Sequence, residues 1–500
     1  MEMVTAAVAA VLSPSVLFFM LVGVLVGAVI GALPGLSVVM AISILTPITF
    51  TLDPAEGLAM LLGVYNSGVW AGGISAILVN TPGTPASIMS TLDGYQMTKR
   101  GEAGLALGIN TIYSAIGGLF STLVLMVAAF PIANFALKFG PAEYFSLALF
   151  GLSMIICVSE KSVVKGVMMG CLGFMLATVG QDSMYAYPRF TYGNVNLLEG
   201  IQYVAVMIGL FGFGEVLTQI YESKEIVGLA EKIKIGKIIP SWKQFLDFAP
   251  ITSLAAFIGV IIGAIPGAGG DIASIVCWDW GKKISKDKDN YGKGSAEGLA
   301  VTCIANNSII GGAMTTMLTL GIPGDAVTAV LIGSLMMYGM QPGPMMFVNN
   351  QEFIYKMMVM MVVANIAFLI FGLLTSKMSA SLLNFKREYV WAAIVILSIV
   401  GSYSVNNSAF DVSIMLLFGV LGFFFKRADF PLPPLILGLI LGPMAESNLR
   451  RSLALTNGSY SIFFVNPISC VLIIATLLAL FGPFLFNLLK GKKNSGDGQS

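Results

Sequence analysis

The dominant pattern along the chain is a series of long stretches that contain no charged residue. Each stretch exceeds the roughly 20 apolar residues that one helix needs to cross the hydrocarbon core of a bilayer. The stretches lack barrel-like alternation, and lipid satisfies no backbone hydrogen bonds, so the spans are predicted to be helical. The clearest examples lie between Glu2 and Asp53, Glu56 and Asp93, Glu102 and Lys138, and Arg451 and Lys490.

The pattern at the N-terminus predicts a membrane helix and not a cleaved signal peptide. Apolar residues continue from Val4 past Gly31, with no basic segment before them and no small-residue cleavage pattern after them. Taken together, the hydrophobic stretches predict an all-α polytopic membrane protein.

Two copies of one sequence unit follow each other along the chain. The motif Gly-Ala-Leu-Pro-Gly at Gly31–Gly35 returns as Gly-Ala-Ile-Pro-Gly at Gly263–Gly267. Downstream, segments 55–85 and 296–326 align without gaps. Nine of their 31 positions are identical: five in Ala-Glu-Gly-Leu-Ala, two in Asn-Ser and two in Pro-Gly. Four short motifs in the same order indicate a duplication.

The charges of the connecting segments predict that the two copies face opposite sides of the membrane. Lys and Arg concentrate on the cytoplasmic side of membrane proteins. In the first copy no basic residue flanks Gly31–Gly35, whereas Lys99-Arg100 follows the later motifs. In the second copy lysine clusters flank Gly263–Gly267, and segment 325–352 has no basic residue. Inverted repeats of this kind let one binding site open to either side in turn.

These features divide the chain into four predicted parts. Residues 1–220 form the first membrane repeat, 221–248 a charged cytoplasmic connector, and 249–489 the second membrane repeat. The polar segment 490–500 is predicted to be a disordered cytoplasmic tail. A lysine-free N-terminal end and a lysine-rich C-terminal end predict a periplasmic N-terminus and a cytoplasmic C-terminus.

Composition narrows the range of functions. Of the 500 residues, 56% are hydrophobic and 11% are charged, whereas soluble domains carry about 25% charged residues. A net charge of +1 gives no basis for binding nucleic acid. The chain has no histidine, which excludes His-based catalytic triads, His-zinc sites and His proton relays. The five cysteines form no Cys-x-x-Cys pair, so we expect them to be packing residues, and we expect no cofactor and no structural metal.

Each copy has a second Gly/Pro-rich break that indicates a transport site. Proline removes a helical hydrogen bond and glycine permits the backbone to unwind. Such unwound backbone is tolerated at membrane depth only when it is buried in protein or lines a wet cavity. A helix that restarts after the break offers free N–H groups and the positive end of its dipole to an anion. The residues predicted to bind a carboxylate are Asn66, Ser67, Thr81, Pro82, Gly83, Thr84, Ser87, Asn307, Ser308, Pro323, Gly324 and Thr328.

Two aspartates near the breaks are candidates for binding a coupling Na⁺ or proton. Asp271 follows the first break of the second copy, and Asp325 follows its second break. Structural roles stay open as alternatives: an aspartate can begin a helix, Asn66 and Asn307 can join helices by hydrogen bonds, and single Gly or Pro residues can serve packing. The predicted coupling-ion set is Asp271, Asp325, Gly31, Gly35, Gly263 and Gly267.

The chain resembles the large membrane subunit of the tripartite tricarboxylate transporters. The resemblance rests on Gly31–Gly35, on 65–85 with its Asn-Thr-Pro-Gly-Thr-Pro block, on 92–95 and on 263–271. It implies import of di- or tricarboxylates such as citrate across a bacterial inner membrane, driven by a Na⁺ or proton gradient. It also implies two partners, a small membrane subunit of about four helices and a periplasmic solute-binding protein. Other broken-helix carriers move a substrate-bearing domain, so an elevator-type movement is expected.

Two other functions stay open as alternatives. A gated anion channel is the first, although channels rarely need two inverted broken-helix units. An intramembrane aspartyl protease is the second, with Asp271 as its catalytic residue. The local sequence is Ala-Gly-Gly-Asp, which misses a Gly-x-Gly-Asp pattern by one glycine, and no second aspartate has a matching motif. The sequence therefore favours a carrier over an enzyme.

Overall fold

The structure is a computed structural model that describes residues 2–158, 162–182, 184–222, 236–267, 269–377, 379 and 387–494. It contains two compact units. Unit 1 comprises Met1–Leu137 and Val204–Phe424, and unit 2 comprises Lys138–Tyr203 and Phe425–Ser500. Residues 223–235 of the predicted connector and residues 495–500 of the predicted tail lie outside the described residues.

Among the described residues, eight helical stretches are long and apolar enough to cross a membrane. The predicted class, an all-α polytopic membrane protein, is thereby confirmed. The eight stretches are α2 (Pro14–Ala32), α4 (Pro54–Val79), α6 (Ala103–Ala136), the continuous run α9 (Tyr203–Met207), η3 (Ile208–Phe213, a π-helix) and α10 (Gly214–Glu222), α11 (Trp242–Ala264), α16 (Gln351–Thr375), α18 (Arg387–Asn406) and α19 (Ala409–Arg427).

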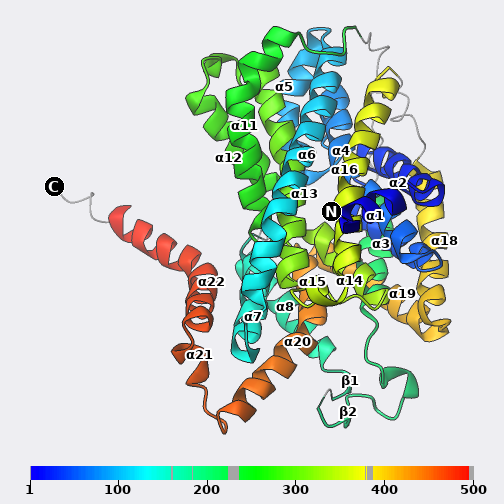
Figure 1. Ribbon diagram of the computed structural model, residues 1–500, viewed down its shortest axis with the longest axis vertical. Helices are drawn as coiled ribbons and strands as arrows, with labels where there is room; N and C mark the ends of the chain where they lie inside the picture. Colours follow the sequence, from blue (N-terminus) through cyan, green and yellow to red (C-terminus); the bar gives the residue numbers. More distant parts are fainter. Residues whose placement is uncertain are drawn as a thin grey trace. The chain divides into compact units, whose positions relative to one another are not determined.

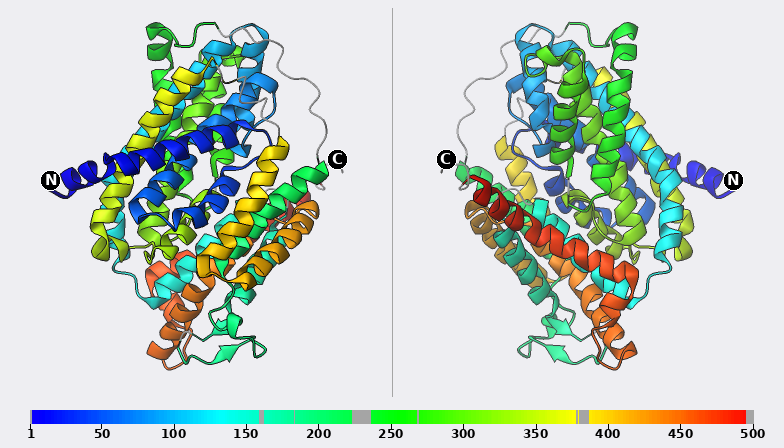
Figure 2. Two further views of the ribbon diagram at one scale, coloured as in Figure 1. Left: turned by 90° about the vertical axis from the view of Figure 1, so that its right-hand side faces the viewer. Right: turned by 90° about the vertical axis from the view of Figure 1, so that its left-hand side faces the viewer.

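The remaining helices complete unit 1, and Figure 2 shows the chain beginning at one side of this unit with α1 and α2 in dark blue. In the sequence these helices lie next to the spans, because the breaks predicted from Gly and Pro divide the apolar stretches into separate helices. They are α1 (Glu2–Val11), α3 (Val38–Thr49), η1 (Pro85–Ser87), α5 (Ile88–Lys99), α12 (Gly269–Ile284), η4 (Lys288–Asn290), α13 (Ala296–Leu320), α14 (Ala326–Met337) and α15 (Met346–Asn349).

Helices α4 and α13 form the interior of unit 1. Both are buried along almost their whole length. Helix α4 begins with Pro54, whose fixed φ suits the first turn of a helix. Helix α13 begins after Ser295, whose hydroxyl accepts a hydrogen bond from the Gly298 N–H at 3.1 Å. Since neither helix faces lipid, both can carry polar side chains in their middle turns.

Each of these two helices packs closely on the first helix of its own copy. In the first copy, a Cβ on Gly31 of α2 would lie 2.3 Å from the carbonyl oxygen of Gly68 in α4. In the second copy, a Cβ on Gly263 of α11 would lie 2.3 Å from the carbonyl oxygen of Ile309 in α13. Only glycine permits backbones to approach so closely, as small residues do between membrane helices.

Helices α6 and α13 lie side by side (Figure 1) and run parallel. Near the start of both, the Cys303 Sγ lies 3.2 Å from the Asn110 Oδ1. Further along both, the Gly311 N–H donates to the Ser121 hydroxyl at 3.2 Å. Residue numbers therefore rise together along this contact.

Helices α4 and α16 also run parallel. The Asn365 side chain of α16 donates to the Asn66 Oδ1 at 3.1 Å. One turn later, the rings of Trp70 and Phe368 stack with their centroids 5.5 Å apart. Here too, residue numbers rise together.

Helices α6 and α16 run in opposite directions. A Cβ on Gly118 would lie 1.8 Å from the Asn365 Oδ1, and a Cβ on Gly372 would lie 2.7 Å from Thr111. The residue number in α6 therefore falls as that in α16 rises. Helix α13 is parallel to α6, and α4 is parallel to α16. Because α6 and α16 run in opposite directions, α4 and α13 are antiparallel.

Unit 2 is a separate group of helices with a small hairpin. Helix α20 packs against α7 and α8, and α22 packs against α7. The hairpin pairs Gly180 with Arg189 in two antiparallel strands of two residues each. The elements are α7 (Pro141–Val158), α8 (Val163–Ala177), β1 (Gly180–Gln181), β2 (Pro188–Arg189), η2 (Val195–Leu197), α20 (Pro433–Leu455), α21 (Ile462–Val465) and α22 (Pro467–Asn494).

Candidate functional site

The first break has the same backbone conformation in both copies. Helix α2 ends before Leu33, which has φ −83° and ψ 117°, and α11 ends before Ile265, which has φ −83° and ψ 116°. Two residues later, Gly35 and Gly267 adopt the left-handed φ values of 90° and 80°. Glycine is needed at these two positions because other residues are strained there. The predicted interruptions of both helices are therefore present.

The second break lies directly against the first break in each copy. Helix α4 ends at Asn80 and α13 at Gly321, both left-handed. A Cβ on Gly83 would lie 2.1 Å from the Gly31 carbonyl oxygen. In the second copy, the Gly324 carbonyl accepts the Gly267 N–H at 2.7 Å. Among the predicted residues, Gly31 thus meets Gly83 in the first copy, and Gly324 meets both Gly263 and Gly267 in the second.

A hydroxyl three residues into the next helix closes each second break. The Ser87 hydroxyl accepts the Thr84 N–H at 3.3 Å and donates to the Thr84 carbonyl at 2.7 Å. The Thr328 hydroxyl accepts the Asp325 N–H at 2.9 Å and donates to Asp325. The hydroxyls predicted to bind substrate at Ser87 and Thr328 therefore also shape the backbone.

Each second break contacts the other copy. The Tyr65 hydroxyl of α4 donates to the Asp325 Oδ2 at 2.6 Å. In the mirror arrangement, η1 packs on α12 and α13, and the Ser274 hydroxyl donates to the Ala86 carbonyl at 3.0 Å. A Cβ on Gly270 would lie 2.8 Å from both Ala86 and the Asn306 Oδ1. The breaks of both copies therefore belong to one buried region.

This region contains buried polar atoms that have no hydrogen-bond partner. They are the Thr84 Oγ1, the Asn306 Oδ1, both polar atoms of the Asn307 amide, and the Asn365 Oδ1. An unsatisfied buried polar group costs about 1–3 kcal/mol. A site that binds a polar ligand explains why such groups are retained, since the ligand supplies the missing partners.

Other predicted residues are satisfied by the backbone. The hydroxyls of Ser67 and Ser308 donate one turn back, to Gly63 at 2.8 Å and to Ile304 at 2.7 Å. The Thr81 hydroxyl donates to the Val79 carbonyl at 3.3 Å. Pro82 and Pro323 interrupt the helices without a side-chain polar group. The two prolines shape the breaks, whereas the hydroxyls of Ser67, Ser308 and Thr81 already donate to backbone carbonyls.

The two predicted coupling-ion aspartates differ in what the structure describes. Asp325 is buried, and its carboxylate accepts the Tyr65 hydroxyl and the Thr328 N–H, the latter at 2.8 Å. Asp271 lies in the first turn of α12, but its side chain lies outside the described atoms. Within the described residues, no three His, Cys, Asp or Glu side chains come together to hold a metal ion.

Sequence reasoning missed three polar residues of this region: Tyr65, Asn306 and Asn365. Tyr65 and Asn306 are equivalent positions of the two copies, separated by the same offset as Asn66 and Asn307. That offset pointed to them, because each precedes an asparagine that was predicted. The only sequence signal for Asn365 is that it is a lone amide in an apolar stretch. Its contact with Asn66 depends on the fold.

A fourth residue, Asp93, holds the two copies together from the middle of α5. Its buried carboxylate accepts four hydrogen bonds, from the Trp278 indole at 2.8 Å and from the N–H groups of Gly292, Gly294 and Ser295 at 2.8, 3.1 and 2.8 Å. A carboxylate surrounded by donors in this way fixes the loop before α13. Asp93 was noted as part of a motif, but its partners lie about 200 positions away.

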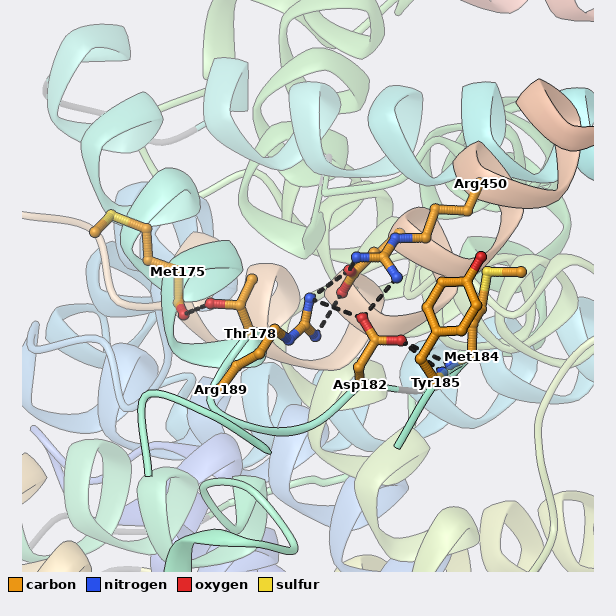
Figure 3. A network of polar contacts seen from close by, with 8 residues as sticks. Met175, Thr178, Asp182, Met184, Tyr185, Arg189 and Arg450 are labelled. Atoms are coloured by element: carbon orange, nitrogen blue, oxygen red, sulfur yellow. Dashed lines mark hydrogen bonds and ion pairs between the residues drawn. The ribbon is translucent and has the colours of Figure 1, made fainter. Parts of the chain in front are cut away.

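Unit 2 carries a separate charged cluster (Figure 3). Arg189 pairs with Glu446 at 2.6 Å, and Arg450 pairs with Asp182 at 2.6 Å. The N–H groups of Met184 and Tyr185, together with Arg450, lower the pKa of Asp182 to about 2. A cavity of about 430 Å³ is lined by Asp182, Arg189 and Arg450, together with Met184 and Tyr185. Because two carboxylates already neutralise its two guanidinium groups, the cluster is not an obvious anion site.

Comparisons with known proteins agree with this geometry. The family model described as "Tripartite tricarboxylate transporter TctA family" matches residues 17–437. An Agrobacterium vitis protein, described as an uncharacterized 52.8 kDa protein in the TAR-I ttuC′ 3′ region, is 34% identical over 465 residues, covering 92% of each chain. A second protein of that species, in the TAR-II ttuC′ 3′ region, is 32% identical over 226 residues, covering 44% of this chain and 93% of its own. No solved structure matches.

Proposed function

The chain belongs to the tripartite tricarboxylate transporter TctA family, and from this premise we propose that it imports di- or tricarboxylates of the citrate type by cation symport. In this proposal it is the permease subunit of a binding-protein-dependent secondary transporter. The observation that carries the proposal is that the two breaks of each copy meet and pack on helices of the other copy, beside buried amide and hydroxyl groups that have no partner. Such neutral donors suit carboxylates.

The two sequence copies act as inverted repeats in this proposal. Their equivalent helices α4 and α13 run antiparallel, and their breaks have matching backbone conformations. Two copies related in this way can exchange conformations, so that the region between them opens first to one side and then to the other. An elevator-type movement of the broken helices is one way to achieve this exchange.

The substrate's carboxylates bind the predicted residues that have free polar atoms, chiefly Thr84 and Asn307. A hydrogen bond to a charged group contributes about 1.5–3 kcal/mol, so several such donors can replace part of a carboxylate's hydration. Na⁺ or H⁺ is the coupling ion, with Asp325 and Asp271 as the acidic groups at the breaks. A symported cation offsets the negative charge of the substrate.

The transporter works in a bacterial inner membrane with two partners. A periplasmic solute-binding protein delivers the substrate, and a small membrane subunit of about four helices accompanies the permease. The N-terminus is periplasmic and the C-terminus cytoplasmic. In support of a common cytoplasmic end, the Arg100 guanidinium donates to the carbonyls of Lys293 and Gly294, so the basic segments of both copies meet.

Uptake of labelled citrate into cells or proteoliposomes tests the proposal. With both partners and a Na⁺ or proton gradient, we expect saturable accumulation, and we expect replacement of Asn307 by Leu to lower it at least about tenfold, since a hydrogen bond to charge is lost. Leucine has the same branching at Cγ and leaves no buried amide unpaired, so the variant is expected to fold.

The control in this experiment is Asn134→Leu, which changes an exposed asparagine near the end of α6, where the backbone is helical. Accumulation that proceeds without any cation gradient would contradict symport. Accumulation that the binding protein leaves unchanged would contradict the tripartite mode of action.

A further inference from the structure

The two second breaks form half-sites that correspond residue by residue. We define the Asp325 half-site as Tyr65, Asp325 and Thr328, and the Thr84 half-site as Asn306, Thr84 and Ser87. Within the alignment of the two copies, Tyr65 corresponds to Asn306, Thr84 to Asp325 and Ser87 to Thr328. Each half-site combines the second break of one copy with the central helix of the other.

The Asp325 half-site already contains a carboxylate. One oxygen of Asp325 accepts the Thr328 N–H at 2.8 Å, and the other accepts the Tyr65 hydroxyl at 2.6 Å. The side chain is buried and both of its oxygens are bonded. The half-site therefore shows how this fold holds a carboxylate: on one side by the break, and on the other by the middle of a helix from the other copy.

The Thr84 half-site also begins with an extended residue before a helix, but it has no charge. Ser87 and Thr84 form the same pair of hydrogen bonds as Thr328 and Asp325. However, the Thr84 hydroxyl and the Asn306 Oδ1 have no partner, although the two residues are only 6% and 5% exposed. Both atoms of the neighbouring Asn307 amide are unpartnered as well. Two side chains of this half-site and the neighbouring Asn307 thus have unpartnered atoms, whereas the equivalent residues Tyr65, Asp325 and Asn66 are hydrogen-bonded.

We infer that a carboxylate of the substrate binds in the Thr84 half-site, in the place that the Asp325 carboxylate takes in the other. This inference rests on the proposed function and assigns a position to one substrate group. The Thr84 hydroxyl and the amides of Asn306 and Asn307 donate to the carboxylate. A half-turn of the Asn306 amide exchanges its oxygen for its NH₂ group and makes it a donor.

The difference between the half-sites also sets selectivity. A second carboxylate of the substrate is repelled from the Asp325 half-site, because two carboxylates close together in a buried region cannot both stay charged without cost. The substrate therefore enters with one carboxylate directed to the neutral half-site. Asn306, which makes no hydrogen bond through its buried oxygen, is a specificity-determining residue in this assignment.

The test introduces into the Thr84 half-site the carboxylate that the other half-site possesses. In Thr84→Asp, the chain's own carboxylate occupies the place of the substrate, while aspartate is as good a helix N-cap as threonine. Citrate binding is measured by calorimetry on the full-length chain in lipid nanodiscs, at one fixed Na⁺ concentration. We expect the affinity for citrate to fall at least about 30-fold in this variant.

Two further variants make the result specific. Thr51→Asp adds the same charge at an exposed position after α3, and we expect its citrate affinity to match that of the unmodified chain. Asn306→Ala removes an amide whose oxygen has no partner in the fold, so we expect an unchanged melting temperature and a citrate affinity lowered about tenfold.

Citrate binding of undiminished affinity in either Thr84→Asp or Asn306→Ala overturns the assignment of the half-site but leaves the proposed function intact. If the unmodified chain binds neither citrate nor succinate under these conditions, and partner-dependent uptake is absent too, the proposed function itself fails.

Discussion

At the scale of single residues, hydrogen bonding separates the groups that shape the breaks from those that are free to bind. Ser67 and Ser308 donate to their own helices, and Ser87 closes a turn. By contrast, Thr84 and Asn307 are buried with unpartnered atoms. Both classes consist of polar side chains. Only the hydrogen-bond partner of each side chain distinguishes a structural role from a binding role.

Asp93 belongs to the structural class, and its removal is predicted to destabilise unit 1. Replacement by alanine leaves four donors without their acceptor, and hydrogen bonds to a charged group are worth about 1.5–3 kcal/mol each before relaxation. We expect Asp93→Ala to lower the melting temperature in detergent clearly. Glu102→Ala, at an exposed position just after α5, is the control and should change it little. Equal melting temperatures for the two variants would contradict this role.

At the scale of elements, close packing of the first two long helices of each copy depends on glycine. Helices α2 and α4 approach through Gly31, and α11 and α13 approach through Gly263. In both copies this contact lies directly beside the first break. Helix packing and the position of the break are therefore coupled.

Gly263→Ala tests this coupling. Its new Cβ would lie 2.3 Å from the Ile309 carbonyl oxygen, so α11 and α13 must separate, at a cost of about 1–3 kcal/mol. We expect reduced thermal stability in detergent and reduced uptake. Gly236→Ala is the matched control, because a Cβ there meets no atom within 4 Å. A stability of Gly263→Ala that equals this control would show that the contact is looser than described.

At the scale of the whole molecule, the proposed inverted repeats place the basic segments of both copies on one side of the membrane. The Arg100 side chain reaches the carbonyls of Lys293 and Gly294, which brings the end of α5 to the loop before α13. Lys99 and Lys282 belong to these basic segments. They are therefore expected on the same face.

Labelling of single cysteines measures this directly. Lys99→Cys and Lys282→Cys are introduced one at a time into a variant without native cysteines, and an impermeant maleimide is applied to intact cells and to inverted vesicles. We expect both positions to react only in inverted vesicles, where the cytoplasmic side is exposed. Reaction from opposite sides would exclude the proposed arrangement of the repeats and the pocket between them.

The sequence by itself determined the class of the protein and the places where its helices break. Charge-free stretches can only be buried in lipid or protein, and Gly and Pro act on the backbone locally. Both patterns can therefore be interpreted without knowledge of the fold. The duplication was equally readable, because equivalent residues keep one offset. Membership of the TctA family agrees with the motifs that carried the resemblance.

Only the tertiary structure decided which polar groups are satisfied and which are free. Whether Asn306 lacks a partner depends on helices that are distant in sequence, as do the contacts of Tyr65 with Asp325 and of Asp93 with Ser295. The sequence also presented the two breaks as equivalent. In the structure they differ, because one half-site has its own carboxylate and the other has none. This difference became apparent once the fold brought each break against the other copy. Hydrogen bonding depends on pairs of groups in space and not on positions along a chain.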